Sequence, residues 1–262
     1  MSEILVVKYG GHAISDDSGL FAQAIADALA KNLMVVVVHG GGPQINAEIT
    51  ARGITPHFIG GFRYTDQATL EAVEEVLVRQ VGPAITANLI AHSIPAVAIS
   101  GLEVIKAQTL THLVDGTSVE LGFVGHVTSI DTVQILSLLE AGKVPVISPI
   151  ALHGSGAGSL NVNADLAAAA IAGALDAIAL IVMTDVPGIY RNWPDRDSLI
   201  SSISRNELFA MKDSFAEGMS PKVAACIEAI DNGARAVRII DGRDPEAFAL
   251  ALENSGGTLV SA

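Results

Sequence analysis

Short apolar runs and amphipathic stretches alternate along most of the chain. Runs rich in Val and Ile predict strands, and stretches in which apolar residues recur every three or four positions predict helices. Residues 19–32 show the helical spacing, whereas residues 35–38 are four consecutive valines. The other expected strands are residues 4–8, 96–100, 144–149, 177–183 and 236–240, and the other expected helices are residues 43–52, 66–92, 132–141, 164–173, 222–232 and 245–252.

Glycine and proline predict three interruptions of this pattern. They are a break in the helical stretch at Gly82-Pro83, a hairpin of strands 106–114 and 119–127 around the turn Asp115-Gly116, and a Gly/Ser-rich loop at 153–159.

Strands that alternate with helices are typical of proteins with a central, mostly parallel sheet. Half of the residues are hydrophobic but only 4% are aromatic, so the core must consist of Ala, Val, Ile and Leu. We therefore expect a three-layer α/β sandwich, built as a single domain over residues 1–262. Ligands of such folds bind at the carboxyl ends of the strands, and several candidate residues directly follow predicted strands.

The composition argues against several classes of function. The formal charge of −13 disfavours binding to nucleic acid and to anionic membranes, because both require clustered Lys and Arg. No apolar run approaches the ~20 residues of a membrane-spanning helix, and no signal peptide is apparent. The single Cys226 cannot form an internal disulfide, so we expect a cytoplasmic protein with Cys226 in its core.

Two glycine-rich segments follow predicted strands. The first, Lys8-Tyr9-Gly10-Gly11, suits a phosphate through its N–H groups and its ammonium group, and suits a tight turn beside a solvated lysine equally well. The second, His39-Gly40-Gly41-Gly42-Pro43, precedes a helix, where free N–H groups and the helix dipole form an anion site. Three consecutive glycines carry an entropic cost, which favours a function. His39 itself is expected to be structural.

Polar residues mark two further segments. Arg63 stands where strand-like sequence gives way to a helix, and its guanidinium suits a carboxylate, although a surface ion pair would also explain it. Asn161 and Asn163 share a face if this segment is extended, and Asp165 begins the next helix. Helix capping explains Asn163 or Asp165 alone but not the whole set.

A lysine is expected where a helix dipole disfavours it. Pro221 opens a helix and places Lys222 in its first turn, so a nearby anion is expected, although a frayed surface lysine is the alternative. The chain has no Gly-x4-Gly-Lys-Ser/Thr loop, no Gly-x-Ser-x-Gly motif and no metal-ligand spacing among its seven histidines. A protein-bound metal is therefore not expected.

In order and spacing, these motifs together resemble the amino-acid kinase family over nearly the whole chain. The segments that carry the resemblance are residues 8–11, 39–43, 63–66, 161–165, 184–190, 197–200, 218–222 and 240–243. Within the family, the likeness is to the kinases of N-acetyl-L-glutamate. It implies ATP-dependent phosphorylation of the side-chain carboxylate of that acid, a step of arginine biosynthesis, with Mg²⁺ carried mainly by the nucleotide.

The resemblance also implies a role for each motif. The implied catalytic residues are Lys8, Lys222 and Asp165, with the lysines beside the transferring phosphoryl group and Asp165 between them. The implied substrate-binding residues are Gly41, Gly42, Arg63, Asn161 and Asn163. The implied phosphate- and ATP-binding residues are Gly10, Gly11, Asp185, Val186, Gly188, Ile189, Tyr190 and Met219. Residues 1–170 would bind the amino acid, and residues 171–262 the nucleotide.

Some positions depart from the family pattern. Phe62 and Tyr64 replace smaller aliphatic residues around Arg63, and the loop after Ser100-Gly101 is shorter than usual. Ser220 stands where Ile or Val is common. Because the first two departures lie near the implied substrate pocket, a related kinase of another N-acylated acidic amino acid remains an alternative.

A second alternative is a catalytically idle homologue that binds a metabolite and acts as a regulator. The presence of Lys8, Asp165 and Lys222 argues against it. The family's arginine-inhibited members carry an additional helix before the first strand. Because the first strand here begins at about Ile4, the resemblance implies a homodimer without arginine feedback, whose partner is a small-molecule substrate.

Overall fold

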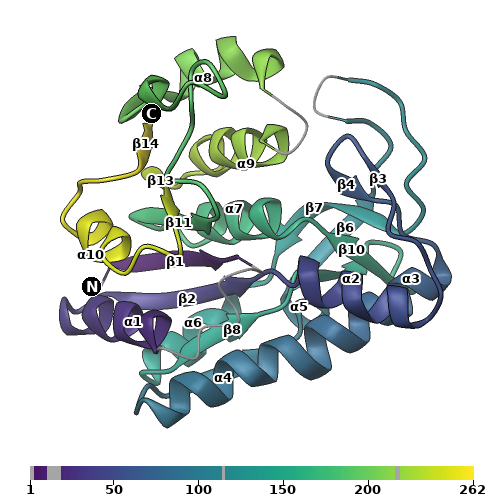
Figure 1. The fold of residues 1–262 in the computed structure, drawn as a ribbon. Coiled ribbons are helices and arrows are strands. Elements are labelled where there is room, and N and C mark those ends of the chain that lie inside the picture. The colour runs from purple at the N-terminus through teal and green to yellow at the C-terminus, as the bar shows by residue number, and fades with distance from the viewer. Residues whose placement is uncertain (1–2, 11–18, 114–115, 216–218) are drawn as a thin grey trace.

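A central sheet of eight strands organises the molecule (Figure 1). The structure is a computed structural model, and it describes residues 3–10, 19–113, 116–215 and 219–262. From edge to edge, the strands are β12 (Ser202–Ser204), β14 (Thr258–Ser261), β13 (Ala236–Asp241), β11 (Ala179–Thr184), β1 (Ile4–Tyr9), β2 (Met34–His39), β8 (Val144–Ile147) and β5 (Ala96–Ile99). Neighbouring strands are parallel except β13 and β14, which confirms the mostly parallel sheet.

Helices cover both faces of this sheet. α7 (Ala164–Ala174) and α9 (Ser220–Asp231) lie on one face, and α1 (Leu20–Ala30) and α4 (Gly82–Ala91) lie on the other (Figure 1). Side chains of a strand alternate between the faces, so Val6 belongs to the core on the α7 side, and Leu5 and Val7 to the core on the α1 side. The expected three-layer sandwich is confirmed, and the same alternation places Lys8 on the α7 face.

A second, four-stranded sheet closes into a small barrel. Its strands are β6 (Ile105–Thr109), β7 (Val124–Ile130), β9 (Ile150–His153) and β10 (Ser159–Val162). β6 and β7 pair antiparallel, which confirms the expected hairpin, although Asp115 in its turn lies outside the described residues. β9 and β10 were not predicted because each spans only four residues, and the expected Gly/Ser loop connects them. A separate hairpin of β3 (Phe58–Ile59) and β4 (Phe62–Arg63) carries Arg63.

The helical stretch 66–92 does not break where glycine and proline predicted. α3 (Gln67–Glu74) runs into a π-helical segment, η2 (Glu75–Val81), and then into α4. Gly82 keeps right-handed helical angles, with φ −56° and ψ −52°. In a regular α-helix, the ring of Pro83 would clash with the carbonyl of Arg79. The wide π-helical segment just before Gly82-Pro83 is an arrangement that accommodates a proline. Because the helix continues through Pro83, the predicted break is wrong.

The remaining helical segments are α2 (Gly42–Ala51), α5 (Gly101–Val104), α6 (Thr132–Glu140), η3 (Arg196–Ser198), α8 (Arg205–Met211), η4 (Lys212–Ser214) and α10 (Ala247–Leu252). Predicted helices agree with observed ones to within two residues at each end. α8 was not predicted, although Ser204 and Glu207 form a capping box at its start, which is the signal that would have located it. Cys226 on α9 is fully buried, as expected.

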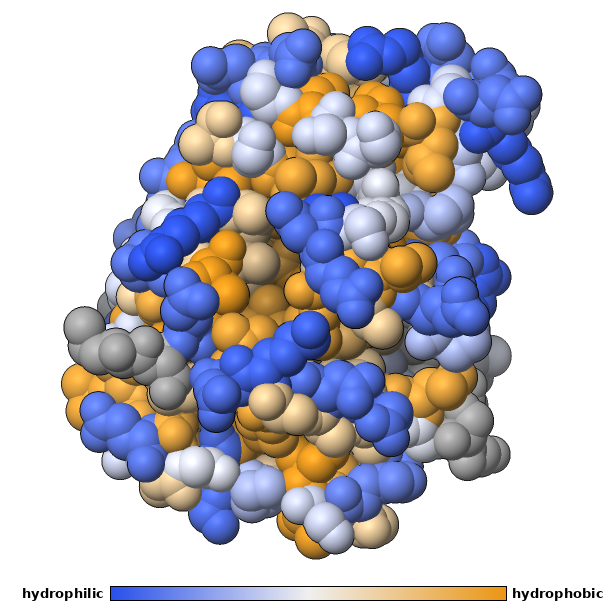
Figure 2. Space-filling model, turned by 90° about the vertical axis from the view of Figure 1, so that its left-hand side faces the viewer, coloured by the Kyte–Doolittle hydropathy of each residue, from blue (hydrophilic) through white to orange (hydrophobic). Residues whose placement is uncertain are grey.

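The surface carries scattered apolar side chains. Figure 2 shows the side of the molecule on which β14 and α10 lie, where apolar side chains appear mainly between hydrophilic ones. Large exposed apolar residues belong to several different elements and include Phe58, Ile90, Val133 and Trp193. Across the described ranges, no helix combines the length and the apolar character needed to cross a membrane.

Candidate active site

Strand ends and helix N-termini surround a cavity of about 550 Å³. The carboxyl ends of β1, β2 and β11 reach it, as do the first residues of α2, α7 and α9. The lining includes the motif residues Lys8, Gly10, Gly41, Gly42, Arg63, Asn161, Asn163, Asp165, Asp185, Val186, Met219 and Lys222. Segments far apart in the sequence therefore meet at the carboxyl ends of the strands, which is where ligands of such folds bind.

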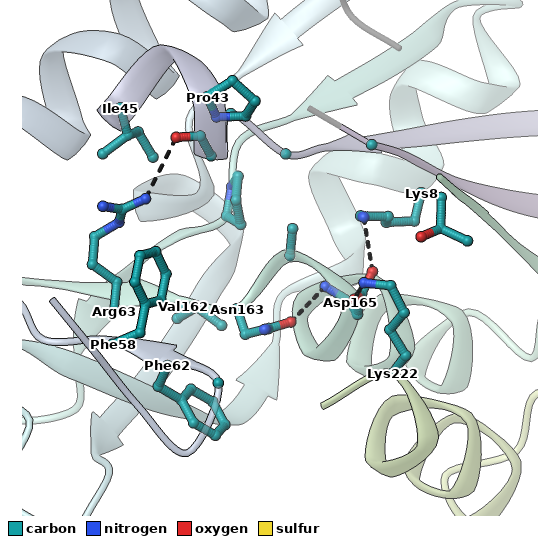
Figure 3. A pocket seen from close by; sticks show the side chains of 18 of the residues that line it. Lys8, Pro43, Ile45, Phe58, Phe62, Arg63, Val162, Asn163, Asp165 and Lys222 are labelled. Carbon is teal, nitrogen blue, oxygen red and sulfur yellow. Dashed lines mark hydrogen bonds and ion pairs between the residues drawn. The ribbon is translucent and has the colours of Figure 1, made fainter. Parts of the chain in front are cut away.

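Two lysines and one aspartate form a buried charge cluster in this cavity. Lys8 Nζ lies 2.9 Å from one carboxylate oxygen of Asp165, and Lys222 Nζ lies 3.0 Å from the other (Figure 3). Lys8 comes from the end of β1, while Asp165 and Lys222 come from the first turns of α7 and α9. Asp165 thus holds the two ammonium groups on either side of one carboxylate.

Burial and charge act against each other at Asp165. Burial alone would raise its pKa, but the charges of Lys8 and Lys222 outweigh burial and hold the pKa of this carboxyl well below its usual range. The charge of Asp165 in turn raises the pKa of Lys222. Asp165 is therefore the anion that offsets the unfavourable position of Lys222 at a helix N-terminus. Two ammonium groups against one carboxylate leave a net positive charge in the cavity.

The two asparagines hold local structure around this cluster. Asn163 is the N-cap of α7, and its Oδ1 accepts hydrogen bonds from the backbone N–H groups of Asp165 and Leu166 at 2.8 and 3.3 Å. Asn161 lies on β10, and its Nδ2 donates to the Thr65 hydroxyl at 3.1 Å. Both asparagines line the cavity. Asn163 therefore caps α7, as the simple alternative predicted, and it also faces the site.

Arg63 lies on the other side of the cavity from the charge cluster (Figure 3). The guanidinium lies 4.7 Å from the centroid of the Phe58 ring, and Nη2 donates a long hydrogen bond of 3.4 Å to the Gly42 carbonyl. Nη1 is buried and has no hydrogen-bond partner within the described part of the chain. Burial lowers the pKa of Arg63 to about 10, so the group stays charged at neutral pH. A buried cation with an unused donor suits a carboxylate ligand.

The glycines bring backbone close to this space. A Cβ on Gly10 would lie 2.7 Å from the Met183 carbonyl oxygen, and a Cβ on Gly41 would lie 2.6 Å from Leu77 Cδ2. Gly41 is the N-cap of α2, and Gly42 is its first residue. Their N–H groups make no hydrogen bond among the residues that the structure describes. Gly11 lies outside the described residues.

The expected nucleotide residues divide into two groups. Asp185, Val186 and Met219 line the cavity, whereas Gly188, Ile189 and Tyr190 do not. Ile189 is fully buried, and its N–H donates to the Thr258 hydroxyl at 2.8 Å.

Sequence reasoning assigned no role to Arg243, which lines the cavity and donates to the Asp185 carbonyl. Residues 240–243 carry part of the family resemblance, but a single exposed arginine after a strand does not indicate a role in a site. The Arg243 guanidinium also pairs with Asp241 at 2.7 Å.

Carboxylates that could bind a metal ion are few. No group of three or more His, Cys, Asp or Glu side chains within the described segments is arranged as a metal site. Both oxygens of Asp165 face lysines, so Asp165 is not free to act as a ligand. Asp185 is the other carboxylate in the lining, and its Oδ1 accepts a hydrogen bond from the Thr184 hydroxyl at 3.1 Å.

Comparison with known proteins gives consistent matches. Residues 3–241 match the model of the amino acid kinase family. An acetylglutamate kinase of Clavibacter sepedonicus is 46% identical over 259 residues, covering 97% of this chain and 86% of that protein. One of Paenarthrobacter aurescens (strain TC1) is 42% identical over 266 residues, covering 97% and 84%. The crystal structure of smu.665 from Streptococcus mutans UA159 has a TM-score of 0.83 and 28% identity, with full coverage of both chains.

The family model spans most of the sheet, and it includes every residue of the charge cluster. Relatives above 40% identity extend over nearly the whole length of the chain. The chain belongs to the amino acid kinase family.

Proposed function

We propose that the chain transfers the γ-phosphoryl group of ATP to the side-chain carboxylate of N-acetyl-L-glutamate, a step of arginine biosynthesis. The observation that carries the proposal is the Lys8–Asp165–Lys222 cluster, which shares one cavity with Arg63 Nη1, an atom without a hydrogen-bond partner among the described residues. The names of the relatives support the choice of acceptor.

The reaction needs no general base. The acceptor carboxylate has an ordinary pKa of about 4.3, so it is ionised at neutral pH. One of its oxygens attacks the γ-phosphorus, the bond from the γ-phosphorus to the bridging oxygen breaks, and ADP leaves with that electron pair. Lys8 and Lys222 neutralise the charge on the transferring group, and Asp165 positions both ammonium groups.

Opposite ends of the cavity would bind the two substrates. Arg63 would bind the α-carboxylate of the acid through Nη1. Asn161 is linked to Arg63 by Thr65, whose hydroxyl accepts from the Asn161 side chain and donates to the Arg63 carbonyl. The N–H groups of Gly41 and Gly42 would bind phosphate or acceptor oxygens, together with Gly10. The expected contacts of Asn163 and Gly11 belong to the same proposal.

The nucleotide would occupy the side lined by Asp185, Val186 and Met219. Magnesium ions bind phosphate oxygens and usually keep several waters, and they supply charge neutralisation. Asp185 would be the carboxylate of the cavity lining that could hold such an ion. In the sheet, strands from the first 170 residues lie on one side of the β1–β11 pair and later strands on the other. This arrangement supports an acid-binding part of residues 1–170 and a nucleotide-binding part of residues 171–262.

A kinase of another N-acylated acidic amino acid is the second candidate. Phe62 and Phe58 lie at the Arg63 end of the cavity, where the chain of the acceptor would lie. A longer or shorter acid would use the same charge cluster, because in this proposal the cluster would contact the phosphoryl group and not the chain of the acid. The acceptor must therefore be identified by assay.

The test is acyl-phosphate formation, trapped with hydroxylamine, in the presence of ATP and Mg²⁺. N-acetyl-L-glutamate, glutamate, aspartate and N-acetyl-aminoadipate are compared side by side. We expect turnover mainly with N-acetyl-L-glutamate, and a loss of at least about 100-fold in Lys8→Ala and Lys222→Ala. Turnover mainly with another acid supports the second candidate. A folded protein that binds ATP but phosphorylates none of them contradicts the proposal.

We also propose that the protein is a homodimer, as the family resemblance implies. Light scattering at micromolar concentration measures the mass directly. A mass near twice 27.0 kDa is expected, and a monomer contradicts this assignment.

A further inference from the structure

His39 is a fully buried histidine at the end of β2, next to the glycine loop Gly40–Gly42, and none of the roles above uses it. Its Nδ1 lies 2.8 Å from the Gly40 carbonyl oxygen. A carbonyl can only accept, so Nδ1 carries a proton. Burial lowers the pKa of His39 to about 4, so the ring is neutral at physiological pH.

This contact fixes the direction of one peptide group. Gly40 N–H donates to the Tyr9 carbonyl at 2.8 Å, and Gly40 C=O accepts from His39, so both sides of Gly40 are held. In a trans peptide the C=O and the following N–H point in opposite directions. With the Gly40 carbonyl turned toward the buried ring, the Gly41 N–H points the other way. Gly41 lines the cavity, and its N–H has no hydrogen-bond partner in the described chain.

The π-helical turn supports the same loop from behind. A Cβ on Gly82 would lie 3.2 Å from His39 Nε2 and 3.3 Å from the Leu77 carbonyl oxygen, which is tighter than most Cβ contacts, so a larger residue here would press on the ring. The Leu77 side chain also packs against Gly41. His39 and Gly41 are thus both in contact with the helix that runs through η2 into α4.

We propose that His39 is a positioning residue that aims the Gly41 N–H into the active site, and that Gly82 provides the space for its ring. The inference rests on the proposed kinase function for its kinetic consequence. In the proposed function the Gly41 N–H would donate to the reacting oxygens, and a donor turned away from them would stabilise the transition state less. The change should appear in kcat more than in the KM of the acid, which Arg63 binds.

Two amide substitutions test this role. The Nδ2 of His39→Asn lies where histidine Nδ1 lies, so it keeps the donor to Gly40. The amide of His39→Gln lies near the position of Nε2, so that donor is lost, while both variants bury a similar amide. We expect His39→Asn to keep kcat within about threefold and His39→Gln to lose tenfold or more, at similar melting temperature. Equal kcat in the two variants overturns the proposal.

Gly82→Ala provides a second test that does not depend on replacing histidine. Alanine is more favourable than glycine within a helix, so a purely structural role predicts no loss of activity in a protein that remains folded. The added Cβ should displace the His39 ring and lower kcat several-fold. Unchanged kcat in Gly82→Ala argues against the proposal.

Failure of the kinase assignment can be separated from failure of this inference. If the wild-type protein phosphorylates no acid, the proposed function fails, and the orientation of the Gly40–Gly41 peptide in crystal structures of the two His39 variants tests the inference alone. A peptide that keeps its direction in His39→Gln contradicts it, whereas a peptide turned only in that variant supports it.

Discussion

Asp165 combines two tasks that are usually separate. It compensates the charge of two lysines in a buried site, and it fixes the distance between their ammonium groups. Breaking a buried charge cluster by removing one partner is costly, because the remaining charges lose their compensation. The cluster is therefore part of both the stability and the chemistry of the molecule.

Asp165→Asn should separate these effects by pH. The pKa of Asp165 is held below its ordinary value of 3.8, so its stabilising effect is present above that value and is lost as the pH falls through the lower folded pKa. We expect the variant to be less stable at pH 7 by about 3–5 kcal/mol, with a difference that shrinks below about pH 4. Urea unfolding at pH 7, 5 and 3 measures this. A difference that does not change with pH would contradict the role of ionised Asp165.

Asn163 poses a choice between a structural and a ligand-binding role. Asn163→Ala should cost about 1 kcal/mol of stability, because the cap of α7 is lost. Asn163→Ser keeps a capping oxygen but removes the side-chain amide, so it should restore stability. If the amide also binds the acid, as the family resemblance implies, the KM for the acid stays raised in the serine variant. A normal KM in Asn163→Ser would assign the residue to capping alone.

Single motifs located some site residues and missed others. Lys8, Asp165 and Lys222 follow strand ends or begin helices, where sheet topology and the helix dipole give a physical reason to expect an anion site. Phe58 and Arg243 carry no such signal. Phe58 reaches the cavity because it lies on the β3–β4 hairpin. Each strand of this hairpin has only two residues, and the conformation of such a short hairpin depends on tertiary contacts.

At the scale of elements, helices were predicted well and short strands poorly. Helix α7 extends over three turns, whereas β9, β10 and β12 have only three or four residues each, which is too short for an alternating pattern to identify a strand. The π-helical turn was also unexpected. Gly82 and Pro83 carry the same local signal whether a helix ends or widens, so the sequence around them does not distinguish the two outcomes.

The alanine-rich helix α7 allows a test of packing. Ala168 is fully buried, and the helix lies between the central sheet and α9. Ala168→Leu should destabilise the protein by about 1–3 kcal/mol through overpacking and should also lower kcat, because a shift of α7 moves Asp165. Ala87→Leu on the exposed face of α4 is the matched control and should change neither quantity. Equal behaviour of the two variants in urea unfolding and in assay would contradict this account.

For the whole molecule, alternating strands and helices were sufficient to predict the layers and the edge of the sheet that binds ligands. The small barrel was not predicted, because its closure depends on pairs such as β6 with β9 that lie more than 40 residues apart. The cavity forms at the carboxyl ends of the central strands, with the β3–β4 hairpin at one end and the first turns of α7 and α9 at the other. Arg63 comes from the hairpin, whereas the lysine cluster comes from β1, α7 and α9.

The central claim is that a carboxylate oxygen of the acid attacks the γ-phosphorus of ATP. Its most direct test uses N-acetyl-L-glutamate labelled with ¹⁸O in the side-chain carboxylate, followed by hydroxylamine cleavage of the product and mass spectrometry of the released phosphate. Hydroxylamine attacks the carbonyl carbon, so the bridging oxygen leaves with phosphorus. We predict phosphate that carries one ¹⁸O atom. Phosphate without label, formed by attack of water on ATP, would contradict the account.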